Sequence, residues 1–362
     1  MSVMTSRERW LAALRCEPVD RIPFWPKIDG AYPRHQTSFF REMKPRDLIS
    51  WTGGDLHIGI PNGVRAVQKH SSIDVKSDGI RRITTFRTVK RTLTYIEGFD
   101  ETSRSHHPIV FPVKTIDDIE ALTELYDDTS YEPDDERLEE AKQILRESGE
   151  TGICVTHIGI SPLMDWLQHL AGIQNGTYLL YDYPEAVSAL FDSMHRGLTR
   201  RAEIIANLNP APVVYAVENT STTLISPSMF RRFCEPYLTA YGRLMADAGK
   251  VFVLHMCGKL KGLLPDIGRV PAHANEAFTS APVGDTSLLD GRTMMPSRCL
   301  IGGTNATLWL EPADTIIETI AHDLAELPHG RGIVLSSAGV MPPRCRPETI
   351  RRVADWIAHS KI

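Results

Sequence analysis

Short apolar runs alternate with amphipathic stretches along most of this chain. From about residue 150 onward, six runs are typical of short buried strands, and the stretches between them place apolar residues at helical spacing. Two further runs of the same kind lie near the N-terminus. The predicted strands are 22–27, 56–59, 153–157, 213–217, 251–255, 273–277, 299–302 and 332–336. The predicted helices are 184–207, 226–248, 260–267, 312–327 and 347–359, several of which begin with Pro or Ser, as helix starts prefer.

Eight strands alternating with helices predict an α/β fold, a (β/α)8 TIM barrel. An open doubly wound sheet is the alternative, but the chain lacks the glycine-rich first turn typical of that fold. Alternation of polar and apolar residues over 80–98 predicts an antiparallel hairpin, and the acidic stretch 117–150 predicts solvated helix with turns. We therefore expect a single barrel domain over 1–362 with a small N-terminal β-hairpin and helical insertion at about 60–150.

Charge and composition narrow the partners. The net charge is -5 and no long Lys/Arg block occurs, so neither nucleic acid nor an anionic membrane surface is expected to bind. No apolar run approaches the roughly 20 residues that span a bilayer, and the first residues are too charged for a signal-peptide core. The six cysteines are widely scattered along the chain, which favours free thiols in a reducing compartment over disulfides. We expect a cytoplasmic protein whose partner is a small molecule or another protein.

Candidate chemistry gathers where the predicted strands end. His255 and Cys257 follow one another with one residue between, so in an extended segment both side chains point to the same side. Glu276 ends the next strand. Imidazole, thiolate and carboxylate are all zinc ligands, and a catalytic zinc keeps one position open. These three residues therefore predict a zinc site, with Glu218 as a candidate catalytic carboxylate.

Other residues at strand ends have more than one interpretation. Glu218 could instead be a metal ligand or part of a structural ion pair, and His157 could be an ordinary packed histidine. The stretch from Trp25 through Lys27 to Asp29 could line a pocket or cover the barrel. Cys345, beyond the last strand, is a candidate fourth zinc ligand.

Nearly the whole chain resembles the uroporphyrinogen decarboxylase superfamily. The residues that carry the resemblance follow one another in the order of that family: an opening helix and strand, a "piks-x-eDl"-like segment, the helix before an "H-x-C-G" strand, that strand itself, and three later turns. They lie at 6–23, 108–118, 224–237, 254–258, 282–285, 300–303 and 335–343. The resemblance implies the same barrel and an enzyme of one of two kinds.

The two branches of the superfamily imply different chemistry. Tetrapyrrole decarboxylases carry an "R-Q-A-G-R" loop after the first strand, and the matching stretch 25–34 lacks it. The branch that works with corrinoid proteins carries zinc on "H-x-C", which His255 and Cys257 match, and on a further cysteine after the last strand. Here Ala338 and Gly339 occupy that place. In the related cobalamin-independent methionine synthases a glutamate after "H-x-C" is a ligand, and Glu276 lies at a comparable distance.

The resemblance thus implies a zinc-dependent methyltransferase component that moves a methyl group between a small molecule and a corrinoid protein. Its zinc would lie on His255, Cys257 and Glu276, and its cobalamin would arrive on the partner corrinoid protein. A metal site with fewer thiolate ligands is a harder Lewis acid and prefers oxygen ligands. This favours a methyl ether as the small molecule that gives or takes the methyl group. The alternatives are a metal-independent decarboxylase of the founding type and a non-enzymatic assembly subunit.

Overall fold

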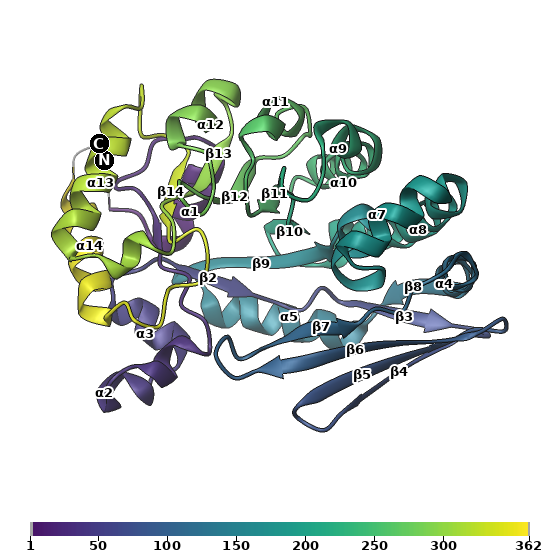
Figure 1. The fold of residues 1–362 in the computed structure, drawn as a ribbon. Helices are drawn as coiled ribbons and strands as arrows, with labels where there is room; N and C mark the ends of the chain where they lie inside the picture. Colours follow the sequence, from purple (N-terminus) through teal and green to yellow (C-terminus); the bar gives the residue numbers. More distant parts are fainter. Residues whose placement is uncertain (1–2, 361–362) are drawn as a thin grey trace. The chain divides into compact units, whose positions relative to one another are not determined.

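The computed structural model describes residues 3–360, and the sheet that carries the site is a nearly closed barrel of eight parallel strands (Figure 1). Around the barrel the strands follow in chain order, apart from the gap between the first two. They are β1 (Phe24–Trp25), β2 (Leu56–Gly59), β9 (Gly152–Gly159), β10 (Val213–Glu218), β11 (Val251–Met256), β12 (Ala274–Phe278), β13 (Cys299–Gly303) and β14 (Ile333–Ser336). The barrel and all eight of the predicted strands are confirmed.

Chain segments divide into two compact units. Unit 1, residues 1–61, 139–157 and 210–362, holds the barrel. Its helices are α1 (Ser6–Leu14), η1 (Tyr32–His35), α2 (Ser38–Arg41), α3 (Pro45–Trp51), most of α5 (Asp135–Ser148), α9 (Pro227–Phe233), α10 (Glu235–Asp247), η3 (Lys261–Leu263), α11 (Leu264–Ile267), α12 (Leu288–Met294), η4 (Leu308–Leu310), α13 (Ala313–Ala325) and α14 (Pro347–His359). The predicted helix 226–248 is two helices that meet at Cys234.

Unit 2, residues 62–138 and 158–209, contains antiparallel sheets and helices. One sheet has the order β4 (Ser72–Ser77), β5 (Arg81–Arg87), β6 (Thr92–Asp100), β7 (Ser105–Val110), and the other pairs β3 (Val64–Gln68) with β8 (Thr129–Pro133). Its helices are α4 (Ile116–Asp128), α6 (Pro162–Asp165), the π-helical turn η2 (Trp166–Leu170), α7 (Ile173–Asp182) and α8 (Pro184–Leu208).

Two sequence expectations concern unit 2 in whole or in part. The hairpin predicted over 80–98 is confirmed, because β5 and β6 pair antiparallel from Arg81 opposite Gly98 to Arg87 opposite Thr92. The expectation of helix with turns over 117–150 is wrong in part, since β8 interrupts it. Thr129 and Tyr131 have side chains that favour strands, and pairing with β3 satisfies their backbone. The acidic composition of this stretch gives no local signal for β8, which pairs with β3.

The interior of the barrel is filled by side chains from alternate positions of its strands. Val213 and Tyr215, Val251 and Val253, and Ala274 belong to one buried cluster. Their spacing of two is the strand period, so the next residues in the same series, beginning with His255 and Glu276, also face inward. The inward face thus changes from apolar to polar toward the carboxyl ends of the strands.

Asp55 joins the two edges of the barrel. Its backbone N–H donates to the carbonyl of Phe24 at 2.6 Å, and its Oδ2 accepts from the backbone N–H of Phe24 at 2.9 Å. The same carboxylate accepts from Arg9 and Arg21, each at 2.8 Å. A buried carboxylate with two guanidinium partners therefore bridges β1 to the residue that precedes β2.

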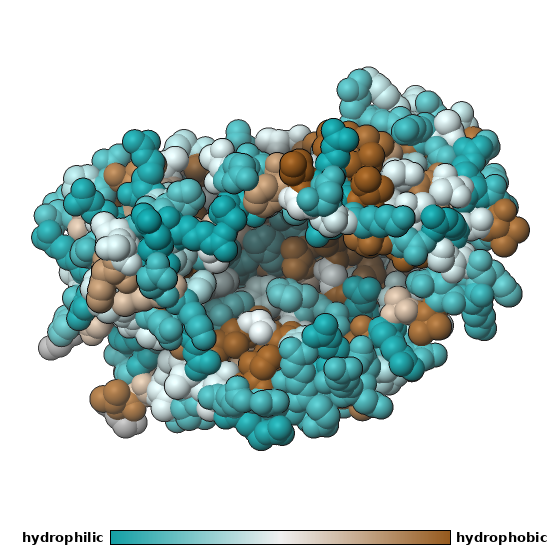
Figure 2. Space-filling view, turned by 90° about the horizontal axis from the view of Figure 1, so that it is seen from below, coloured by the Kyte–Doolittle hydropathy of each residue, from teal (hydrophilic) through white to brown (hydrophobic). Residues whose placement is uncertain are grey.

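One face of the molecule and the lengths of its helices can be compared with the sequence expectations. Hydrophilic residues cover most of the face drawn in Figure 2, and hydrophobic residues appear on it in separate patches. None of the helices within residues 3–360 combines the length and the apolar character that crossing a membrane requires.

Candidate functional site

The strand pair β11 and β12 brings His255 and Glu276 side by side. The two residues are register partners, and each is the inward-facing residue of its strand at that level. Glu276 is 2 % exposed, and its Oε2 contacts the imidazole Nδ1 of His255. Cys257 follows β11, where the thiol donates to the Oδ1 of Asn219 at 3.0 Å. The register of β11 and β12 thus places the ends of these two strands side by side.

Lys27 is the fourth member of a cluster that it forms with His255, Cys257 and Glu276. Its Nζ donates to the Oε1 of Glu276 at 2.6 Å and to the carbonyl of Ala338 at 2.9 Å. Glu276 thus has one oxygen on Lys27 and the other on His255. Ala338 lies in the segment after β14 where the corrinoid branch carries its second cysteine, so a lysine ammonium is held against that segment.

Backbone strain surrounds the cluster. Lys27, Ala277 and Ala338 have φ of 48°, 62° and 60°, in the left-handed region that non-glycine residues rarely occupy. Ala277 is also the extra residue of a β-bulge in β12, where the register with β13 shifts between Glu276 and Phe278. Bulges of this kind re-aim side chains beside functional sites. One of the three strained residues is Lys27 itself. Ala277 directly follows Glu276 in the chain, and Ala338 carries the carbonyl that accepts the hydrogen bond from Lys27.

The charges of the cluster follow from its contacts. Burial alone would raise the pKa of Glu276, but Lys27 and His255 outweigh it and lower that pKa to about 2. Burial would lower the pKa of His255, whereas Glu276 and, to a lesser degree, a hydrogen bond with Cys257 raise it to about 9. Without a metal, an ionised carboxylate is therefore shared at neutral pH by an ammonium and an imidazolium.

A neutral aromatic layer lies within the same barrel. The Nε2 of His57 and the hydroxyl of Tyr215 are 3.0 Å apart, and the rings of Trp25 and His57 stack with centroids 4.0 Å apart. Burial lowers the pKa of His57 to about 3, so the ring is neutral. Desolvation also lowers the pKa of His157, although the residue is exposed, and the centroid of its ring lies 5.6 Å from that of Tyr215. Sequence reasoning missed His57 and Tyr215, although the alternation of β2 and β10 could have marked both as inward-facing.

Two other predicted residues are placed apart from this cluster. Glu218 is fully buried, but its register partner is Met256, while Val217 is the partner of His255. Successive strand residues point to opposite faces, so Glu218 lies on the opposite face from His255. Cys345 is buried, its thiol lies 3.8 Å from the carbonyl of Arg346, and burial raises its pKa to about 12. A catalytic role for Glu218 and a ligand role for Cys345 stay predictions.

The donor set of the cluster fits zinc in its chemistry. His255 offers nitrogen, Cys257 sulfur and Glu276 oxygen, and the hydrogen bond from Lys27 to Glu276 is the kind of outer contact that orients a ligating carboxylate. The three ligand atoms do not all lie within 4.8 Å of one another in this arrangement. Binding of an ion would therefore require these three side chains to move closer together.

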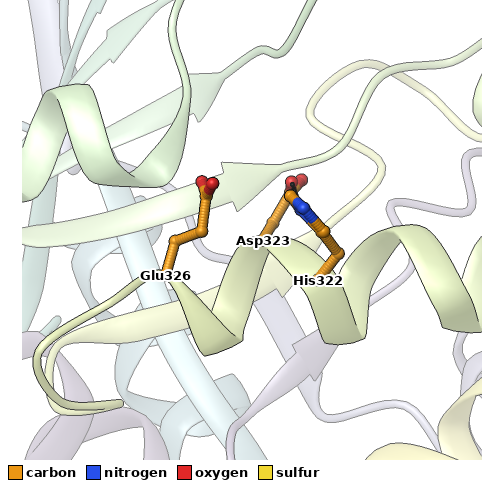
Figure 3. Close-up of side chains that lie close together, drawn as sticks. All are labelled: His322, Asp323 and Glu326. Atoms are coloured by element: carbon orange, nitrogen blue, oxygen red, sulfur yellow. Dashed lines mark ion pairs between the residues drawn. The ribbon is translucent and has the colours of Figure 1, made fainter.

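Among residues 3–360, one trio of possible ligands does meet that spacing, namely His322 and Asp323 on α13 and Glu326, the C-cap residue of that helix (Figure 3). His322 and Glu326 are exposed, and all three project from one helix. Exposed acidic groups of this kind are common without a bound ion. We assign no function to this trio.

Comparison with known proteins places the chain in a family. The family model of uroporphyrinogen decarboxylase (URO-D) matches residues 101–359. The chain belongs to the uroporphyrinogen decarboxylase family. The superfamily expected from the sequence motifs is thereby confirmed. The cluster of charged residues described above lies on the inner side of the barrel of this family member.

Solved structures share the fold of this family member. A methyltransferase from Methanosarcina mazei aligns with a TM-score of 0.60 and 16% identity, and the alignment covers 98% of each chain. A structure from Listeria monocytogenes, named as a candidate vitamin-B12 independent methionine synthase, aligns with a TM-score of 0.38 and 10% identity over 60% of this chain and 68% of that one. No curated protein matches the sequence. The first of these likenesses shows the fold.

Proposed function

We propose that this family member is a zinc-dependent methyltransferase, which moves a methyl group between a small molecule and a corrinoid protein. The observation that carries the proposal is the convergence of His255, Cys257 and Glu276 at the carboxyl ends of neighbouring barrel strands. That end of a TIM barrel is where active sites lie. The methyltransferase from Methanosarcina mazei, with the same fold, adds support by analogy.

The chain's own residues would each have a definite part. His255, Cys257 and Glu276 would hold zinc, which supplies Lewis-acid polarisation of the atom that gains or loses the methyl group. Lys27 keeps Glu276 ionised and binds its Oε1, so Oε2, which contacts His255, would be the oxygen offered to the ion. His255 would release its proton when it binds a metal, since the ligating imidazole is neutral. The ligand set has one thiolate, which favours a methyl ether as the small-molecule partner.

Metal content tests this assignment. Protein purified without chelators should contain near-stoichiometric zinc by plasma mass spectrometry, and the double variant His255→Ala with Cys257→Ala should lose it. Cys154→Ser is the matched control, because it removes a buried thiol that belongs to a separate core cluster, and it should keep its zinc. Only trace zinc in the wild type, or zinc retained by the double variant, would overturn the proposal. Methyl transfer from an aryl methyl ether to free cob(I)alamin then measures the activity.

A second candidate is a metal-independent decarboxylase, favoured by the charged cluster itself. The ion pairs of Glu276 with Lys27 and His255 need no metal. In such a reaction the bond from carbon to the substrate carboxylate breaks, carbon dioxide leaves, and the carbanion takes a proton from the His255 imidazolium. Turnover of a carboxylated substrate that persists in excess chelator and is lost in His255→Ala would favour this candidate over the first.

A further inference from the structure

Unit 2 contains a cavity of its own, of about 430 Å³. Every residue that lines it belongs to that unit, so it owes nothing to the barrel cluster. Its walls come from β3, β4, β5, β8, the end of β9, α4, α6 and α8, and they are largely apolar, with Phe86, Leu125 and Leu198 among them. Two tyrosines, Tyr126 and Tyr131, add aromatic faces. This volume lies within the range of pockets that hold small organic ligands.

Asp165 is the polar group of this cavity that most needs a partner. It ends α6 and directly precedes the π-helical turn Trp166–Leu170, a feature that is frequent at functional sites. Among the described residues, no group donates a hydrogen bond to its carboxylate. Burial raises the pKa of Asp165, although His169 and Arg201 oppose that rise. A carboxylate that lines an apolar cavity without a donor is costly unless something else supplies one.

Arg201 provides the complementary donor. Its Nη1 donates to the carbonyl of Ile158 at 2.9 Å, and its guanidinium lies 5.1 Å from the centre of the Tyr131 ring. Its Nε is buried and has no partner among residues 3–360. Gly159 leaves room for this arrangement, because a Cβ there would lie 3.2 Å from the Nη1 of Arg201. The cavity therefore presents an acceptor and a donor that the fold itself leaves largely unpaired.

We infer that this cavity is a binding site for a small aromatic molecule that carries a hydroxyl group, with the hydroxyl donating to Asp165. A hydroxyl both donates and accepts, so one group can serve the carboxylate and a guanidinium N–H. The ring suits the apolar and aromatic walls. A positively charged ligand fits less well, because the charges of His169 and Arg201 already act on Asp165. The inference is independent of the function proposed for the barrel.

Phenol is the probe. In saturation-transfer NMR with the full chain, phenol should bind in the millimolar range, as expected for so few heavy atoms, and toluene should bind more weakly. Asp165→Leu should weaken phenol binding about tenfold, the effect of losing a hydrogen bond to a charged group, and should leave toluene binding nearly unchanged. Asp165→Asn, which preserves shape and one acceptor oxygen, should fall between the two and guards against a folding defect in the leucine variant.

Two controls locate the site. Asp182→Asn changes an exposed aspartate of the same unit and should bind phenol as the wild type does. The barrel variant His255→Ala with Cys257→Ala should also bind phenol normally. Equal binding of phenol and toluene, or binding unaffected by both Asp165 variants, would overturn the inference. Absence of phenol binding to the wild type would do the same and would indicate a cavity that holds only water.

Discussion

Replacement of Lys27 by methionine should destabilise the protein, because the buried carboxylate of Glu276 would lose one of its two positively charged partners. Lys27 is 13% exposed in its side chain and Glu276 is 2% exposed, so the pair is almost free of solvent screening. Methionine has a similar length and no charge. The carboxylate of Glu276 would keep His255 as its remaining charged partner.

The magnitude follows from this geometry. Removing one partner of a buried ion pair costs about 3–5 kcal/mol. Because His255 still contacts the other oxygen of Glu276, we expect the lower end, about 3 kcal/mol. A chain of 362 residues unfolds with an entropy of about 0.8 kcal/mol/K near its midpoint, so Tm should fall by about 4 °C.

Thermal unfolding at pH 7, with chelator present, measures the effect. Lys44→Met is the matched control, since Lys44 is exposed and its side chain makes no capping hydrogen bond. That variant should shift Tm by less than about 1 °C. Adding Glu276→Gln to Lys27→Met should recover part of the loss by removing the unpaired charge. A shift for Lys27→Met no larger than the control, or a further loss in the double variant, would refute the reasoning.

Two further predictions concern the junction of β1 and β2. Asp55→Asn should lower the free energy of unfolding by about 3 kcal/mol in urea titrations, because Arg9 and Arg21 would lose their shared buried carboxylate; unchanged stability would contradict the role of Asp55 in joining the barrel edges. Burial would raise the pKa of Asp20, but its hydrogen bonds, chiefly from Arg9, lower it to about 2. Its contribution is therefore complete above about pH 3.8 and is lost as the pH falls toward 2, so Asp20→Asn should flatten the decline of stability across that window.

The strands were predictable because their apolar runs reflect burial on both faces, and the order of the runs then defines a barrel. The same logic located His255 and Glu276, which share an inward-facing register. Lys27 was recognised only as a residue near a strand end. Its role depends on a left-handed backbone and on contacts 249 and 311 residues away along the chain, to Glu276 and Ala338. Neither property has a local sequence signal.

Side-chain direction explains the other differences. Glu218 and His57 both lie near strand ends, but one residue of register decides whether such a group enters the barrel or its outer layer. The predicted strand placed Glu218 at the carboxyl end of the barrel, but it did not determine to which side of the strand its side chain points. His57 was passed over, although Tyr215 and Trp25 contact it within the barrel. Strand β8 was missed because its pairing with β3 is not visible in its own acidic neighbourhood.

The three left-handed residues bear on attempts to design such a site anew. Each non-glycine residue in that region costs about 1–3 kcal/mol, and the surrounding barrel must offset all three. Copying Lys27, His255 and Glu276 onto another barrel would transfer the functional groups without the bulge at Ala277 or the turn at Ala338 that aim them. A successful graft would have to carry the backbone of these three strand ends with it, because here the chain path, more than the choice of side chains, defines where the charges meet.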